Sequence, residues 1–141
     1  VYVQTASDMQ QAVLDLFPSQ DCVYMAAAVS DFSVNASELK LKRGEVEALS
    51  LTGTTDILAE LSQLKVDQRL VGFCLEDNDI IKNARQKLIS KGVDYMVANA
   101  PSSIGQSLRD VMILSSQSDD VQTLNQMDLV NLSYRLAMLS V

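Results

Sequence analysis

The chain has 141 residues, of which 48% are hydrophobic and 21% are charged. This length and composition predict one soluble folded domain, because a disordered chain would contain fewer apolar residues. The 18 acidic and 11 basic residues give a formal net charge of −7, which argues against general affinity for nucleic acid or an anionic membrane. The sequence contains no histidine, so sites that depend on histidine are excluded.

No segment has the features of a membrane helix or a secretion signal. The longest apolar run, residues 22–29, is far shorter than the roughly 20 residues that span a bilayer. The first ten residues lack the basic and long apolar regions of a signal peptide. Cys22 and Cys74 lie in apolar runs without disulfide or metal-ligand spacing, so we expect buried free thiols and a cytoplasmic protein.

The predicted elements alternate between strands and helices along the chain. The predicted strands cover residues 1–5, 22–29, 46–51, 69–76, 93–99, 110–116 and 121–124. The first predicted helix runs from a cap at Thr5 or Ser7 to about Phe17, and the second begins near Asp56 with Thr54 or Thr55 as its cap. The third covers residues 79–91 and ends at Gly92, and the last begins from a cap at Asn125.

This alternation predicts an α/β fold, a Rossmann-like three-layer domain with a mostly parallel sheet and helices on both faces. We assign residues 1–141 to a single domain, with a flap or hairpin near residues 35–52, and the strand over 22–29 to the centre of the sheet. Ligands in such sheets bind beyond the carboxyl ends of the strands. The predicted ligand-binding segments are therefore residues 28–32, 74–77 and 99–102.

Three consecutive alanines, residues 26–28, replace the large apolar side chains expected late in a buried strand. Each such large side chain would contribute roughly 1.5 to 3 kcal/mol when buried. Small side chains there would let a flat or phosphorylated ligand approach the backbone, with Asp31 at the edge of the opening. The alternative is that a helix packs tightly on the alanines and that Asp31 is a turn residue.

Cations are concentrated at two places in this acidic chain. Lys40, Lys42 and Arg43 form a local field suited to phosphate or carboxylate, or else a charged edge strand that resists aggregation. Lys87 and Lys91 are four residues apart on a predicted helix and point the same way, although cations there also complement the helix dipole.

Phe73, next to Gly72, is either a core residue or a platform on which a base stacks. No Gly-rich phosphate loop is present in the sequence. The residues alone therefore predict an α/β domain with an anion site.

Five ordered blocks of sequence resemble a known family. They are AAAVSDF, KLKR, TTDILAEL, LVGFCLED and ARQKLISKGVDYMVAN. In this order and spacing they resemble phosphopantothenoylcysteine synthetase, the ligase of coenzyme A biosynthesis that is often fused to a flavin-dependent decarboxylase. The resemblance covers nearly the whole chain.

The resemblance implies a ligase that joins 4′-phosphopantothenate to cysteine. In the bacterial family CTP and Mg²⁺ are used to make an acyl-cytidylate, which the cysteine amine then attacks. The resemblance implies that Lys40 is catalytic by neutralising phosphate charge and that Asp31 is a magnesium ligand. The implied nucleotide-binding residues are Ala28, Asp31, Lys40, Thr54, Thr55, Asp56, Ile57, Phe73, Lys87 and Lys91.

The sequence departs from the family pattern at two places. Thr54 and Thr55 stand where bacterial members often have Asn-Pro, and Ala100 and Pro101 follow Asn99 where the family usually continues Asn-Asp-Val. The family's first strand, its Gly-rich turn and a catalytic Asn would precede the first residue. We therefore expect a truncated domain that is inactive alone.

Partners and alternatives also follow from the resemblance. It implies a homodimer, with FMN as a cofactor only if a decarboxylase is fused upstream. A noncatalytic nucleotide-binding or dimerisation module of the same fold is the alternative function. A flavin or nicotinamide binder is a third reading, which the lack of a Gly-rich turn weakens.

Overall fold

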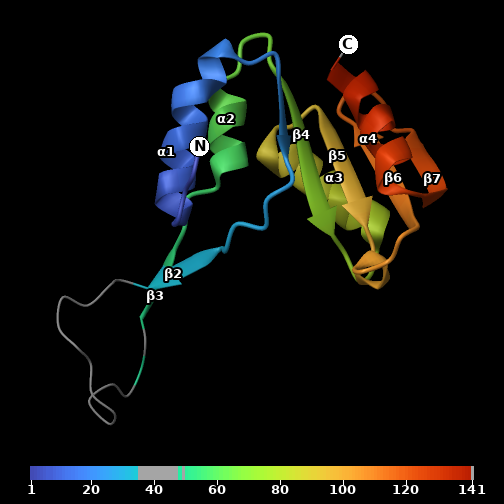
Figure 1. Ribbon diagram of the computed structural model, residues 1–141, viewed down its shortest axis with the longest axis horizontal. Helices are drawn as coiled ribbons and strands as arrows, with labels where there is room; N and C mark the ends of the chain where they lie inside the picture. The colour runs from blue at the N-terminus through green and yellow to red at the C-terminus, as the bar shows by residue number, and fades with distance from the viewer. Residues whose placement is uncertain (35–47, 49, 141) are drawn as a thin grey trace.

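The computed structural model describes residues 1–34, 48 and 50–140, and its centre is a five-stranded sheet with the order β1-β4-β5-β6-β7 (Figure 1). The strands are β1 Cys22–Met25, β4 Arg69–Leu75, β5 Tyr95–Asn99, β6 Arg109–Ser115 and β7 Val121–Met127. A separate antiparallel pair consists of β2 Phe32–Val34 and β3 Leu51–Gly53. This pair confirms the hairpin that the sequence predicted; Lys40 lies between its strands, outside the described residues.

The sheet is mixed, with both parallel and antiparallel strands. Strands β1, β4 and β5 are parallel, whereas β6 and β7 are antiparallel to their neighbours. The predicted α/β fold is confirmed, but the sheet is less uniformly parallel than expected. The reason is loop length, because the connections after β5 and β6 are too short for the crossover that a parallel pair requires.

Helices cover both faces of the sheet, so the domain has the three predicted layers. The helices are α1 Ala6–Leu16, α2 Ile57–Leu64, α3 Ile80–Lys91 and α4 Leu129–Ala137, with 3₁₀ turns at Phe17–Ser19, Pro101–Ser103 and Met138–Ser140. Side chains of α1, α2 and α3 share one core with the sheet, and Leu132 of α4 belongs to a second core. Strand β4 contributes Leu70 to the first core and Val71 to the second, as expected for alternating side chains.

The helix ends show which caps the sequence identifies. Thr5, one of the two caps predicted for α1, forms a capping box with Asp8, and Gly92 ends α3 as predicted, in the left-handed conformation at φ 63°. The predicted caps of the other two helices are wrong. The caps are Asp56 for α2 and Asp128 for α4, whose carboxylates accept backbone N–H groups in the first turn at 3.2 and 2.8 Å.

Two strand predictions near the N-terminus are also wrong. Residues 1–5 form no strand among the described residues, and β1 lies at the edge of the sheet rather than at its centre. Strand β1 stops at Met25 because the backbone N–H of Ala26 turns back to the carbonyl of Tyr24 at 3.1 Å. The three alanines therefore lie in the loop beyond the strand.

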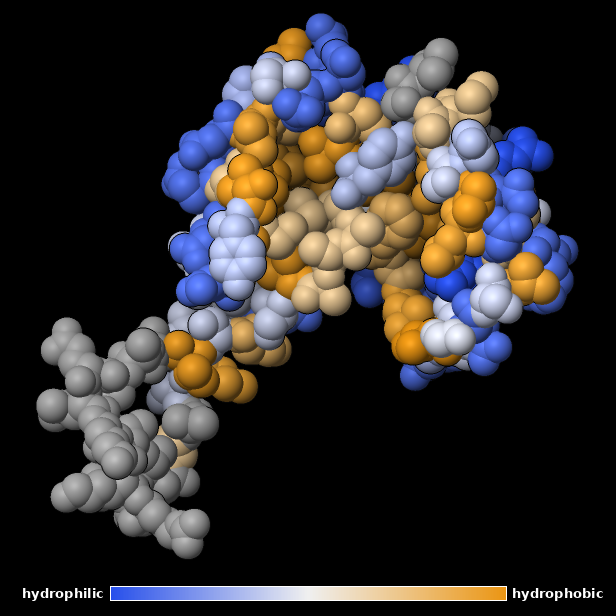
Figure 2. Space-filling view, in the orientation of Figure 1, coloured by the Kyte–Doolittle hydropathy of each residue, from blue (hydrophilic) through white to orange (hydrophobic). Residues whose placement is uncertain are grey.

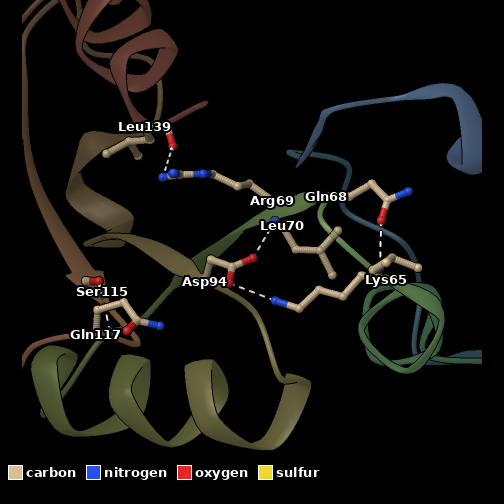
Figure 3. A network of polar contacts seen from close by, with 9 residues as sticks. Lys65, Gln68, Arg69, Leu70, Asp94, Ser115, Gln117 and Leu139 are labelled. Carbon is tan, nitrogen blue, oxygen red and sulfur yellow. Dashed lines mark hydrogen bonds and ion pairs between the residues drawn. The ribbon is translucent and has the colours of Figure 1, made fainter. Parts of the chain in front are cut away.

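A network at the amino-terminal end of β4 and β5 holds the sheet to α2 (Figure 3). Asp94 accepts the backbone N–H of Leu70 at 2.8 Å and pairs with Lys65 at 2.7 Å. Arg69 donates to the carbonyl of Leu139 at 3.1 Å, which fastens the C-terminal turn to β4. These contacts lie at the opposite end of β4 from its carboxyl end, so we assign them a structural role.

Figure 2 shows apolar side chains gathered between α1 and α2 on one side and α4 on the other. They lie over the region where Figure 1 draws β1 and the loop that follows it. None of the helices described here is both long enough and apolar enough to span a bilayer.

Candidate functional site

A cavity of about 470 Å³ opens at the carboxyl ends of β1 and β4. This is where parallel α/β sheets bind ligands, and the volume lies in the range of small-molecule sites. The cavity is lined by Met25, residues 27–31, residues 54–58, residues 73–75, Lys87 and Lys91.

All the predicted site residues that the structure describes line this one cavity. They are Ala28, Asp31, Thr54, Thr55, Asp56, Ile57, Phe73, Lys87 and Lys91. Lys40 is outside the described residues, so its position stays a prediction. Of the three segments expected at strand ends, 99–102 lies elsewhere, since Ala100 and Ser102 line a separate cavity of about 540 Å³.

Two loops distant in sequence are fastened together at the cavity wall. The backbone N–H of Thr54 donates to the carbonyl of Asp31 at 3.0 Å, and the Thr54 hydroxyl donates to the carbonyl of Ser30. This contact continues into the pairing of β2 with β3, where Phe32 faces Gly53. The alanine loop and the start of α2 therefore form one wall.

Asp56 has two partners at this wall. One carboxylate oxygen accepts the backbone N–H of Ala59, and the other lies 2.7 Å from Nζ of Lys91. Burial would raise the pKa of Asp56, but the Lys91 contact and the backbone hydrogen bonds outweigh burial and lower the pKa. The carboxylate thus occupies the N-terminus of α2, where the helix dipole favours a negative charge.

Lys87 is paired with Glu76, a residue that the sequence did not single out. Nζ of Lys87 lies 2.7 Å from Oε1 of Glu76, and this contact raises the pKa of Lys87. Asp31 adds a smaller favourable charge interaction with Lys87. Among the described residues, the two cations that line the cavity therefore already have a carboxylate partner.

Burial disfavours the reactive thiolate form of both cysteines. Burial, together with the charge of Glu76, raises the pKa of Cys74 to about 11, and burial also raises the pKa of Cys22. Both are free thiols, as predicted, although they are half-buried rather than buried. Phe73 packs against the second core and also lines the cavity, so its two predicted roles are compatible.

The family model described as the DNA/pantothenate metabolism flavoprotein C-terminal domain matches residues 1–139. The chain belongs to this family. It is 44% identical over 100 residues to the coenzyme A biosynthesis bifunctional protein CoaBC of Bacillus subtilis, an alignment that covers 69% of the chain and 24% of that protein. The chain thus spans about a quarter of the length of this relative.

Two solved structures have the same fold as this chain. The C-terminal domain of a CoaBC superimposes with a TM-score of 0.80 at 26% identity, over 99% of this chain and 63% of that chain. A mutant of Cab2, solved in complex with phosphopantothenate-cysteine, superimposes with a TM-score of 0.77 at 17% identity, over 99% of this chain and 51% of that chain. The resemblance is confirmed: the chain corresponds to the phosphopantothenoylcysteine synthetase part of CoaBC.

The cavity offers one carboxylate at the expected metal position, Asp31. No group of three or more acidic or thiol side chains that could hold a metal occurs in the described part of the chain. Mg²⁺ is commonly bound by one or two carboxylates together with water and substrate phosphates. Asp31 therefore fits a magnesium ion that arrives with a nucleotide.

The ion pair of Asp56 with Lys91 predicts a pH-dependent difference in stability. Because folding lowers the pKa of Asp56 below its ordinary value of 3.8, the stability it contributes is present above about pH 4 and is lost as the pH falls further. Asp56→Asn keeps a good helix cap but removes the charge. We expect urea unfolding to show wild type more stable than Asp56→Asn at pH 6 and the difference to shrink at pH 3. A difference that stays constant with pH would contradict this role.

Proposed function

We propose that the chain is the nucleotide-binding part of a phosphopantothenoylcysteine synthetase and that the cavity at the ends of β1 and β4 holds CTP with Mg²⁺. The observation that carries the proposal is the gathering of the nine described site residues in one cavity. These residues come from four separate stretches of sequence. It is unusual for all the residues predicted from four separate stretches to line the same cavity unless they share a role.

The charges in the cavity suit a triphosphate. Lys87 and Lys91 project from successive turns of α3, and neither side chain is fully buried. Ammonium groups bind phosphate as point charges, and Mg²⁺ at Asp31 would neutralise further phosphate charge. The chain as a whole carries −7, so the anion site is local.

The wall made of small residues suits the rest of the nucleotide. Ala27 and Ala28 are exposed, and their methyl groups leave the backbone of the loop open to a flat ligand. The Asp56 carboxylate repels phosphate, so it suits a hydroxyl or amino group of the nucleoside. Phe73 offers an aromatic surface at the same cavity.

In the proposed reaction the carboxylate of 4′-phosphopantothenate attacks the α-phosphorus of CTP and releases pyrophosphate. The amine of cysteine then attacks the acyl carbon of the acyl-cytidylate and releases CMP. Lys40, Lys87 and Lys91 orient the triphosphate and offset the charge that develops on the leaving pyrophosphate. Magnesium supplies Lewis-acid stabilisation of the phosphates, and Asp31 would hold it.

The proposal predicts that CTP with Mg²⁺ binds the chain and raises its melting temperature. Lys87→Met and Lys91→Met should each weaken CTP binding about tenfold in calorimetric titration, since each removes a charged contact with phosphate. Lys82→Met is the matched control, because Lys82 lies on the same helix outside the cavity lining. Absence of CTP binding, or equal effects of all three substitutions, would refute the proposal.

The alternative is a noncatalytic module that binds a nucleotide or mediates dimerisation. CTP binding without CTP-dependent pyrophosphate release by a synthetase of complete domain length would favour this alternative. The homodimer, the cytoplasmic location and FMN in a fused decarboxylase remain proposals that follow from the family.

A further inference from the structure

Glu76 is a carboxylate that the structure holds in place behind the cavity. It follows β4 directly, and its backbone N–H donates to the carbonyl of Asn99 at 3.0 Å, which extends the pairing of β4 with β5. Its side chain is only 11% exposed, and Oε1 lies 2.7 Å from Nζ of Lys87. Within the described residues Oε1 is buried and accepts no hydrogen bond of ordinary geometry, so the Lys87 ammonium compensates its charge.

The two lysines at the cavity differ in how easily they can leave their partners. Lys91 pairs with Asp56, whose side chain is 47% exposed and also accepts the N–H of Ala59, so Asp56 stays solvated without Lys91. Lys87 pairs with Glu76, which would be left as a buried, uncompensated charge. An incoming anion can therefore draw Lys91 away from its partner, but not Lys87.

Lys87 can serve Glu76 and an anion at once. An ammonium has three N–H donors, and the Glu76 contact occupies one side of the group. The Lys87 side chain remains 45% exposed and lines the cavity. Its remaining donors are therefore available to a phosphate without breaking the ion pair.

We propose that Glu76 is the positioning residue of the site: it fixes the Lys87 ammonium at the cavity wall before and after a triphosphate binds. This inference rests on the proposed function, because it assigns the anion that Lys87 meets. The inference adds Glu76, a residue outside the cavity lining, to the site. It also gives the two lysines different roles, because Lys87 stays paired with Glu76 while Lys91 exchanges Asp56 for the anion.

Positioning and simple charge balance predict opposite effects when Glu76 is neutralised. If Glu76 only adds negative charge near the site, Glu76→Gln should strengthen triphosphate binding by removing a repulsion. If Glu76 positions Lys87, Glu76→Gln should weaken binding, because the freed side chain loses rotamer entropy when it meets the anion. Whether Glu76→Gln strengthens or weakens triphosphate binding therefore distinguishes charge balance from positioning.

The experiment measures the affinity of the chain for magnesium tripolyphosphate and for CTP with magnesium by calorimetry. We expect Glu76→Gln to raise both dissociation constants about fivefold and Glu76→Asp, which keeps the charge on a shorter arm, to raise them less. Lys65→Met is the control, because it removes an ion pair of the same length at the other end of β4. This control should change neither constant more than about twofold.

A second readout follows Lys87 without any ligand. The pKa of Lys87, measured by ¹³C NMR of its side chain, should fall in Glu76→Gln and stay unchanged in Lys65→Met. Tighter or unchanged binding by Glu76→Gln, or an unchanged Lys87 pKa, would overturn the inference. If the wild-type chain bound no triphosphate, the proposed function would fail, and Glu76 would have no role in anion binding. A lowered Lys87 pKa in Glu76→Gln would then still show that Glu76 and Lys87 are paired.

Discussion

Lys40→Ala should lower the turnover of a complete synthetase that contains this chain by about 10²- to 10³-fold, the usual loss when one preorganised donor to a developing charge is removed. Lys40 belongs to the run KLKR in a chain of net charge −7. The family resemblance implies that it corresponds to the lysine that neutralises phosphate charge. The segment that contains it is flanked by β2 and β3, which start beside Asp31 and end beside Thr54 at the cavity wall.

The test of Lys40 is the rate of CTP-dependent pyrophosphate release at saturating substrates, compared with the melting temperature of the same protein. We expect the melting temperature to be retained, because the sheet and the helices that cover it pack from residues on either side of the segment. Lys42→Ala is the control, since it removes an equal charge two residues away. A normal turnover for Lys40→Ala, or an equal loss for Lys42→Ala, would remove Lys40 from the catalytic residues.

Gly72→Val should destabilise the domain by about 1 to 3 kcal/mol, as expected for overpacking a filled core. Gly72 lies in the middle of β4, and a Cβ there would already lie 3.0 Å from Leu58 of α2 and 3.0 Å from Met96 of β5. Both neighbours are buried, so the two further methyl groups of valine would push α2 away from the sheet.

The same substitution should affect the cavity, because Leu58 and Asp56 sit at the start of α2 and line it. We expect Gly72→Val to lower the urea midpoint and to weaken CTP binding together. Gly53→Val is the matched control: Gly53 ends β3, and a Cβ added there would meet no described atom within 4 Å. Equal stability of the two variants would contradict close packing at Gly72.

The sequence predicted the helices and strands themselves better than it predicted which strands lie side by side in the sheet. The cap at Thr5 and the left-handed stop at Gly92 each involve residues within one turn; Gly92 was predicted, and Thr5 was one of the two caps predicted for α1. The position of β1 at the edge of the sheet was not predicted. A strand that is apolar on both faces is also compatible with the centre of a sheet, and strand pairing depends on residues distant in sequence. The caps Asp56 and Asp128 compete with nearby Thr and Asn residues that have similar capping preferences.

The site was predictable mainly through the family resemblance. Each residue had a structural alternative, such as the helix dipole for Lys87 and Lys91 or the core for Phe73, and the pattern alone could not choose between them. Glu76 lies in segment 74–77, which was expected at a strand end, but it was not singled out because Asp77 and Asp79 follow it and no spacing distinguishes it from them. Its importance appears only when the sheet places it 2.7 Å from Lys87, a residue of the next helix.

The central claim is that one cavity at the ends of β1 and β4 receives the triphosphate, and NMR mapping of CTP with Mg²⁺ on the isotope-labelled chain tests it most directly. The account predicts saturable shifts in the backbone signals of residues 27–31 and 54–58 and in the side chains of Lys87 and Lys91. Shifts confined to the separate cavity around Ser102 and Arg109, with residues 27–31 unmoved, would contradict it.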